Sequence, residues 1–307
     1  MTHTAVVAAP VAEVYRLVAD VTLWPVVFGP TVHVEHLHRT SRDERFQLWA
    51  LVGGQVRTWV SRRELDPDRH RITFRQERSH APIAAMAGAW SLRPDGAGRT
   101  EVVLDHVFSV TDPAELAAIS AAVDRNSTEE LAALRRFAEL GPPLDELVDT
   151  FSDTVVLPGR LADLYDFINR GDLWPQRLPH VARVALTEDE PGIQHLEMDT
   201  VTADGATHTT RSIRVCAAPA SIAYKQLVPP AMLLGHSGRW QFTERPDGVE
   251  VTATHTVAID PAAAEGALGA DDTLARARRY LRAALGVLPE DVRATVTRRT
   301  AGPAVPA

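Results

Sequence analysis

The hexapeptide Arg71-Ile72-Thr73-Phe74-Arg75-Gln76 recurs 150 residues further along the chain as Ser221-Ile222-Ala223-Tyr224-Lys225-Gln226. Other pairs keep almost the same spacing: Trp24-Pro25 with Trp174-Pro175, Trp90 with Trp240, and, at an offset of 149, His106 with His255. Several matches in one register indicate an internal duplication, which predicts two tandem copies of one domain.

The bulk composition supports two soluble, globular domains. The chain has 307 residues, of which 45% are hydrophobic and 23% charged. A net charge of −8 disfavours nucleic-acid binding. The single cysteine, Cys216, excludes an intrachain disulfide and any Cys-rich zinc site, and fits a cytoplasmic location. Charges at Glu13, Arg16 and Asp20 argue against a signal peptide, and no run of 18 apolar residues predicts a membrane span.

Each copy has the same expected order of elements. In the first copy, Pro10 begins a helix after a first strand, and turn signals at Gly53-Gly54 and Pro94-Asp95-Gly96 separate later strands. The expected strands are 4–8, 32–39, 44–52, 55–66, 71–78, 86–92 and 100–110, with a short helix at 24–28 and a long one at 113–139. This order predicts an α+β, helix-grip fold: a curved antiparallel sheet around a long C-terminal helix, with an internal cavity.

The expected domain limits follow from the repeat and from the linker that begins at Gly141-Pro142-Pro143. We expect a first domain at 1–147, a second at 148–301 and a tail at 302–307. The second copy should close with a helix at 271–285, a break at 286–289 and a further helix at 290–299.

Strand alternation places one histidine on the apolar face of each closing strand. Val102, Leu104 and Phe108 share a face with His106, and Val251, Ala253 and Val257 share one with His255. A lone histidine on such a face is either a satisfied core residue or a pocket residue.

Two arginines are further candidates. Arg63 and Arg211 each either face the interior or extend to solvent. Alternation puts Arg211 on the more apolar face of its strand with Ile213, and Ile213 aligns with Arg63. No nucleotide-binding or zinc-protease motif is present, and His33, His36 and His38 are interpreted as surface residues, so we expect no metal and no cofactor.

Several motifs resemble the polyketide aromatase/cyclases of the START/Bet v1-like superfamily, which act in bacterial type II polyketide synthesis. They are Trp24-Pro25, Trp59-Val60-Ser61-Arg62-Arg63, Trp90, His106 and Asn126-Ser127-Thr128. Two tandem copies resemble the di-domain subclass. The resemblance implies aldol closure of the first ring of a poly-β-ketone on an acyl carrier protein, and loss of water to aromatise it. Di-domain members are associated with C7–C12 closure, often on chains already reduced at C9. Polyketide synthase and ketoreductase components would then be partners.

The resemblance also implies roles for individual residues. His106 and His255 would transfer protons, and Arg63 and, by strand facing, Arg211 would hold a ketone oxygen as it becomes an enolate. The substrate would be bound by Trp24, Phe28, Trp59, Ser61, Trp90, Asn126, Trp174, Tyr224 and Trp240. His208, His236 and Tyr224 offer alternative polar groups in the second copy, which departs more from the family pattern. Two alternatives stay open: a non-catalytic carrier of a hydrophobic ligand, and one catalytic domain beside a structural one.

Overall fold

The structure is a computed structural model that describes residues 1–79, 81–201 and 205–285. It divides into two compact units, Met1–Leu144 and a second that begins at Asp145. The short helix α4 (Leu144–Leu147) precedes the first strand of the second unit, which begins at Val148. The tail and the closing helix expected at 290–299 lie outside the described residues.

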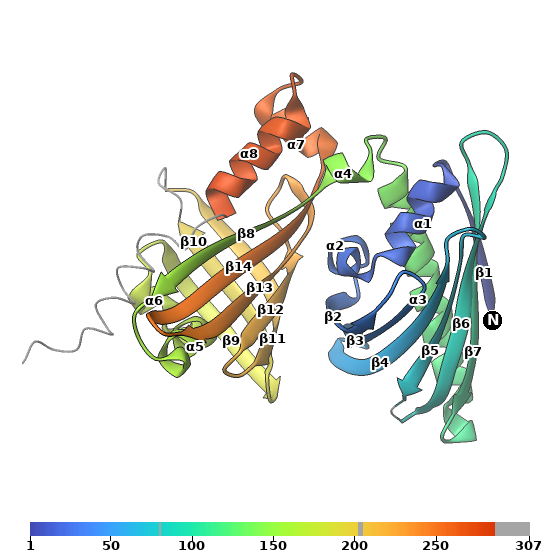
Figure 1. Cartoon of the computed structure of the whole chain (residues 1–307), viewed down its shortest axis with the longest axis horizontal. Helices are drawn as coiled ribbons and strands as arrows, with labels where there is room; N and C mark the ends of the chain where they lie inside the picture. The colour runs from blue at the N-terminus through green and yellow to red at the C-terminus, as the bar shows by residue number, and fades with distance from the viewer. Residues whose placement is uncertain (80, 202–204, 286–307) are drawn as a thin grey trace, which may run out of the picture. The chain divides into compact units, whose positions relative to one another are not determined.

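The first unit is a seven-stranded antiparallel sheet with its helices on one face (Figure 1). Its strands are β1 (Thr2–Val7), β2 (Thr31–Arg39), β3 (Asp43–Val52), β4 (Gln55–Asp66), β5 (Arg71–Arg78), β6 (Ile83–Pro94) and β7 (Thr100–Val110). They lie in the order β1-β7-β6-β5-β4-β3-β2. Gly53 and Gly54, with φ of 59° and 82°, make the two-residue β3–β4 turn, which needs left-handed backbone.

The helices of the first unit connect and cover this sheet. They are α1 (Val11–Ala19), η1 (Val21–Leu23), α2 (Trp24–Val27), η2 (Pro113–Glu115) and α3 (Leu116–Ala138). The sequence predicted that Pro10 is the first residue of α1. In the structure Pro10 is the N-cap, and the helix begins at Val11. The long helix α3 packs against β1 and β7, and buries a stripe at helical spacing that includes Val123, Ser127 and Leu134.

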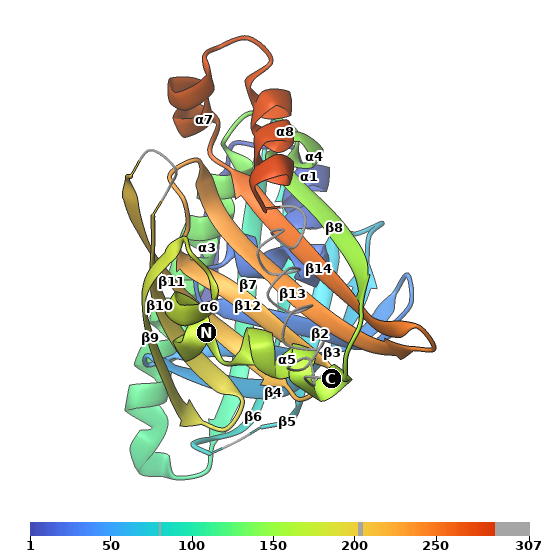
Figure 2. The ribbon, with the colours of Figure 1, turned by 90° about the vertical axis from the view of Figure 1, so that its left-hand side faces the viewer.

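The second unit repeats this plan in the order β8-β14-β13-β12-β11-β10-β9. Its strands are β8 (Val148–Leu157), β9 (Val181–Glu190), β10 (Ile193–Val201), β11 (Thr207–Ala217), β12 (Ser221–Val228), β13 (Leu233–Arg245) and β14 (Gly248–Ile259). Its helices are α5 (Leu161–Asn169), η3 (Gly171–Leu173), α6 (Trp174–Arg177), α7 (Pro261–Leu268) and α8 (Thr273–Leu285). Figure 2 shows β14 between β8 and β13. The two sheets confirm the predicted α+β duplication.

Candidate functional site

His106 lies on the inner face of the first sheet, the face that the helices cover. Its Nδ1 is 3.3 Å from the hydroxyl oxygen of Ser127 on α3, and the Phe74 ring packs edge-on against it with centroids 5.3 Å apart. Burial, with a smaller contribution from the nearby His3, lowers the pKa of His106 to about 4. The imidazole is therefore neutral near pH 7 and is prepared to accept a proton rather than to donate one.

Glu130 is a candidate that the sequence analysis missed. It lies one helical turn beyond Ser127 on α3 and is half-buried. Burial raises the pKa of its carboxyl to about 7, with a smaller contribution from Glu129. Among the described residues it makes no hydrogen bond or ion pair. The sequence feature that could have identified Glu130 is an acidic residue within the inward-facing stripe of an amphipathic helix.

His255 occupies the equivalent position in the second sheet, but its surroundings are more polar. The phenolic oxygen of Tyr224 lies 2.9 Å from its Nδ1, and Nε2 of His236 lies 3.2 Å from the same atom. The Tyr224 oxygen and Nε2 of His236 are also 3.3 Å apart. Phe151 stacks on the other side of the His255 ring. His236 and His255 are 2% and 6% exposed and Tyr224 is half-buried, so both imidazoles of this cluster are shielded from solvent.

Burial fixes the protonation of this cluster. It lowers the pKa of His236 to about 3 and also lowers that of His255, so both imidazoles are neutral near pH 7. It raises the pKa of Tyr224, so the phenol keeps its proton. Nδ1 of His236 is buried without a hydrogen-bond partner among the described residues. A buried donor or acceptor left without a partner costs about 1–3 kcal/mol, so this nitrogen is a place that a bound water or ligand can satisfy.

Arg63 is buried on the inner face, which is one of the two orientations that the sequence left open. It is 1% exposed, and its Nε donates to Glu44 at 2.6 Å. Its Nη1 and Nη2 donate to the carbonyls of Val18 and Ala19 at the end of α1, at 2.8 and 2.6 Å. These bonds tie α1 to the sheet. The role predicted for Arg63, to hold a ketone oxygen, therefore competes with bonds that the fold already uses.

The predicted inward orientation of Arg211 is wrong. Its side chain is 62% exposed and pairs with Glu197 at 2.7 Å. The buried arginine of this strand is Arg214, 3% exposed, which donates to the carbonyls of Ile168 and Asn169 on α5 at 2.6 and 3.2 Å. Arg214 is opposite Tyr224 in the sheet, as Arg63 is opposite Phe74. Arg214, and neither Arg211 nor Ile213, is thus the counterpart of Arg63.

The predicted aromatic residues form two groups around these arginines. In the first domain, the Trp24 ring lies 5.0 Å from the Arg63 guanidinium carbon and 5.6 Å from the Phe28 ring. Trp59 packs on the same cluster. In the second domain, the Trp174 ring lies 5.3 Å from the Arg214 guanidinium carbon, and Trp174 packs with Trp240 against one apolar core.

The remaining predicted residues are distributed along the inner side of the first domain. Trp90 is buried between Ile72 and Leu104 on the neighbouring strands, and Ser61 is buried beside Phe46. Asn126 precedes Ser127 on α3 and is half-buried. The internal cavity expected beside these residues stays a prediction.

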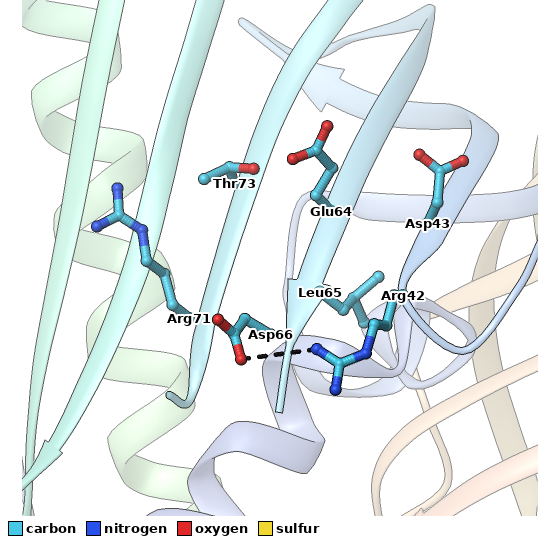
Figure 3. Close-up of a pocket in the computed structure, with 7 residues that line it drawn as sticks. All are labelled: Arg42, Asp43, Glu64, Leu65, Asp66, Arg71 and Thr73. Carbon is cyan, nitrogen blue, oxygen red and sulfur yellow. Dashed lines mark ion pairs between the residues drawn. The ribbon is translucent and has the colours of Figure 1, made fainter. Parts of the chain in front are cut away.

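A hollow of about 460 Å³ lies elsewhere, over β3, β4 and β5 (Figure 3). Asp43, Glu64 and Thr73 are neighbours across these three strands and project from them into the hollow. At its end Arg42 is 3.9 Å from Asp66. None of the predicted substrate-binding residues lines it, and its charged walls do not suit an apolar chain.

The structure adds two observations about cofactors and membranes. Within residues 1–79, 81–201 and 205–285, no three His, Cys, Asp or Glu side chains are grouped so that they could hold a metal ion. No helix in the same ranges is long and apolar enough to cross a membrane. His36, interpreted from the sequence as a surface residue, is half-buried with its Nε2 at 3.0 Å from Glu44.

Comparison with known proteins follows the same two-domain division. A family described as polyketide cyclase/dehydrase and lipid transport matches residues 1–139 and again 149–293. The chain is 54% identical, over 92% of its length and 89% of the relative's, to the granaticin polyketide synthase bifunctional cyclase/dehydratase of Streptomyces violaceoruber. It is 53% identical, over 92% and 91%, to the actinorhodin counterpart from Streptomyces coelicolor.

Two solved structures are similar over almost the whole chain. The di-domain aromatase/cyclase BexL from the BE-7585A biosynthetic pathway has a TM-score of 0.83 at 43% identity, covering 99% of both chains. The di-domain aromatase/cyclase StfQ from the steffimycin biosynthetic pathway has a TM-score of 0.81 at 36% identity, covering 98% of both. This chain therefore belongs to the polyketide cyclase/dehydrase family, in its di-domain form, and is an enzyme.

Proposed function

We propose that this enzyme closes the first ring of a poly-β-ketone by a C7–C12 aldol reaction and dehydrates that ring to an aromatic one. The substrate is carried by an acyl carrier protein, and the enzyme works with the other components of a type II polyketide synthase, including a C9 ketoreductase. The relatives named as bifunctional cyclase/dehydratases support both halves of the reaction. The observation that carries the proposal is a neutral histidine beside a hydroxyl group in each domain, half-buried at His106 and buried at His255.

The chemistry requires a base that becomes an acid. A neutral imidazole takes a proton from a methylene carbon between two ketones, and the resulting enolate attacks a ketone carbon to form the ring bond. The imidazolium returns that proton to the new alkoxide. In the dehydration, an imidazole takes the next α-proton and gives a proton to the departing hydroxyl, which leaves as water. Because burial lowers the pKa of His106 and His255, their imidazolium forms are strong acids that release the proton readily.

The test is reconstitution with a minimal polyketide synthase, with and without the ketoreductase, followed by mass spectrometry and NMR of the products. Three samples are compared: no added enzyme, wild type, and the double variant His106→Phe/His255→Phe. We expect a dehydrated aromatic first ring with wild type only, and the spontaneous mixture in the other two. Thermal melting of the double variant controls for its folding.

A product profile that wild type leaves unchanged, in both ketoreductase conditions, would contradict the proposal. The family description also includes lipid transport, which corresponds to the carrier alternative. If the protein is such a carrier, it should bind a polyketide in stoichiometric amount without altering it. The same mass spectrometry detects this outcome.

A further inference from the structure

Three adjacent strands bring Tyr224, His236 and His255 together on the inner face of the second sheet. Tyr224 on β12, Gly238 on β13 and His255 on β14 are direct cross-strand neighbours. Gly238 leaves the space through which the phenol reaches His255, since a Cβ there would lie 2.5 Å from the Tyr224 hydroxyl. His236 comes two residues earlier on β13, on the same face, and its ring stacks on His255 at 5.5 Å.

The first domain has the same frame without the same polar groups. Phe74, Gly88 and His106 are cross-strand neighbours there, and a Cβ on Gly88 would lie 2.4 Å from the Phe74 ring. Phe74 therefore corresponds to Tyr224. Met86, two residues before Gly88, corresponds to His236. A phenylalanine and a methionine thus stand in the first domain where the second has a phenol and an imidazole.

We infer that Tyr224 and His236 are positioning residues that hold His255 in the tautomer with a free lone pair on Nε2, which makes the second domain the dehydration site. This inference rests on the proposed function and names the domain and the residues that carry its proton transfer. The chain of hydrogen bonds runs from His255 Nδ1–H to the Tyr224 oxygen, and from the Tyr224 hydroxyl to His236 Nε2.

The observed contacts support this direction. The two distances along the chain are 2.9 and 3.3 Å. Nε2 of His255 makes no hydrogen bond with any residue that the structure describes, so it is the nitrogen left for a substrate. A base whose second nitrogen is held by another group, itself oriented by a third, is the arrangement that activates catalytic histidines in general. Among the described residues, the His106 ring has only the Ser127 hydroxyl at 3.3 Å as a hydrogen-bond partner, and no third group orients that hydroxyl.

The proton balance is closed within the site. Nε2 of His255 takes the α-proton of the cyclised β-hydroxy ketone, the Cα–H electron pair forms the new C=C bond, and the C–O bond breaks. Nε2 then gives the proton to the departing hydroxyl, which leaves as water. His255 returns to its starting tautomer because Tyr224 and His236 keep their own protons.

The chain itself supplies the substitutions for a test. Tyr224→Phe and His236→Met install the side chains that the first domain carries at Phe74 and Met86. Tyr280→Phe and His208→Met are the matched controls: Tyr280 is exposed, and His208, a candidate polar group from the sequence, is exposed as well and lies outside the buried cluster. Each variant is assayed for the rate of dehydration in the reconstituted synthase. Each is also labelled with ¹⁵N-histidine, and the tautomer of His255 is read by long-range ¹H–¹⁵N NMR.

We expect wild type and both controls to show His255 protonated on Nδ1. Tyr224→Phe should shift the proton toward Nε2 and slow dehydration by about 10- to 100-fold, less than the full contribution of a general base, which is about 10²–10⁴-fold. His236→Met should give a smaller shift of the same sign. A variant whose melting temperature equals that of wild type is folded, so its slower dehydration cannot be due to unfolding.

Two results would overturn the inference: an unchanged His255 tautomer in Tyr224→Phe, or a changed tautomer with an unchanged dehydration rate. Failure of the proposed function is a different result, because wild type itself would then form no aromatic product while the tautomer could still be measured.

Discussion

Burial, and not pairing with charges, sets the protonation of the main candidate side chains. It is the largest cause of the shift for His106, His236, His255 and Glu130. The three histidines are consequently neutral around pH 7, and Glu130 is neutral below about pH 7, so folding stability depends on pH. Neutral imidazoles and a carboxyl with a pKa near 7 are groups that can exchange protons with a substrate at neutral pH.

Glu130 gives a stability prediction with a defined sign. Its folded-state pKa of about 7 lies above the ordinary glutamate value of 4.5, so the folded state binds the extra proton between these values. Stability should therefore fall as pH rises from 4.5 to 7. Glu130→Gln should match wild type at pH 4 and exceed its free energy of unfolding at pH 8 by about 1–3 kcal/mol. Urea denaturation at the two pH values is the measurement, and a Gln variant that is equally or less stable at pH 8 contradicts the burial argument.

Arg214, and not Arg211, is the inward arginine of β11, and strand alternation alone did not predict this. Alternation was read by assuming that the more apolar face points inward. In β11 both faces are buried at this point: Ile213 on the more apolar face is fully buried, and Arg214 on the opposite face is 3% exposed. The usable signal was loop length: three residues join β11 to β12 where four join β4 to β5, which shifts the counterpart of Arg63 from 213 to 214.

Between elements, the main difference between the domains is the partner of the buried arginine. Glu44 on β3 is opposite Arg63 and pairs with it, whereas Gln194 on β10 is opposite Arg214. Gln194 donates instead to Glu188 and Asn169, at 2.8 and 3.2 Å. The second domain therefore holds its buried guanidinium with carbonyls of α5 and without a carboxylate within ion-pair distance among the described residues.

Glu44→Gln gives the first domain the side chain that the second domain has at the equivalent position, Gln194. We expect it to cost about 3–5 kcal/mol of unfolding free energy, because it leaves Arg63 buried without its counter-charge. The control is Asp43→Asn, the adjacent residue, whose pair with Arg62 is partly exposed and should be worth no more than about 1 kcal/mol. Urea denaturation compares the two. Equal losses would show that Arg63 does not depend on Glu44.

Gly238 tests how tightly β12, β13 and β14 are packed. A Cβ there would lie 2.5 Å from the Tyr224 hydroxyl and 2.6 Å from the Thr254 carbonyl, so backbone or ring must move. Gly238→Ala should lower the dehydration rate and the stability, by about 1–3 kcal/mol for the latter. Gly266→Ala on α7, where nothing lies within 4 Å, should be neutral or slightly stabilising. Thermal melting and the product assay measure both effects, and a Gly238→Ala variant that resembles Gly266→Ala contradicts the geometry.

For the whole molecule, the repeat in the sequence was enough to predict two α+β units and the bounds of most strands. β4, β5 and β7 have the predicted limits, since Gly and Pro turn signals bound them. The second unit was harder: α7 was not predicted, because Pro261 and a run of alanines give weak helical periodicity. The cluster of Tyr224, His236 and His255 required the register between three strands, which no single strand pattern contains.

The duplication gives two units of one fold whose inner faces differ in polar content. The first offers His106 with one hydroxyl, and the second offers His255 with a phenol and a second imidazole. This divergence favours a division of labour over two equivalent active sites. We assign dehydration to the second domain on this basis, and ring closure can then depend on the first.

The most direct test compares His106→Phe with His255→Phe in the reconstituted synthase, with the cyclised but undehydrated product quantified over time by mass spectrometry. We expect His255→Phe to accumulate this intermediate and His106→Phe not to accumulate it. Accumulation in His106→Phe alone, or in neither variant, would contradict the assignment of dehydration to the second domain.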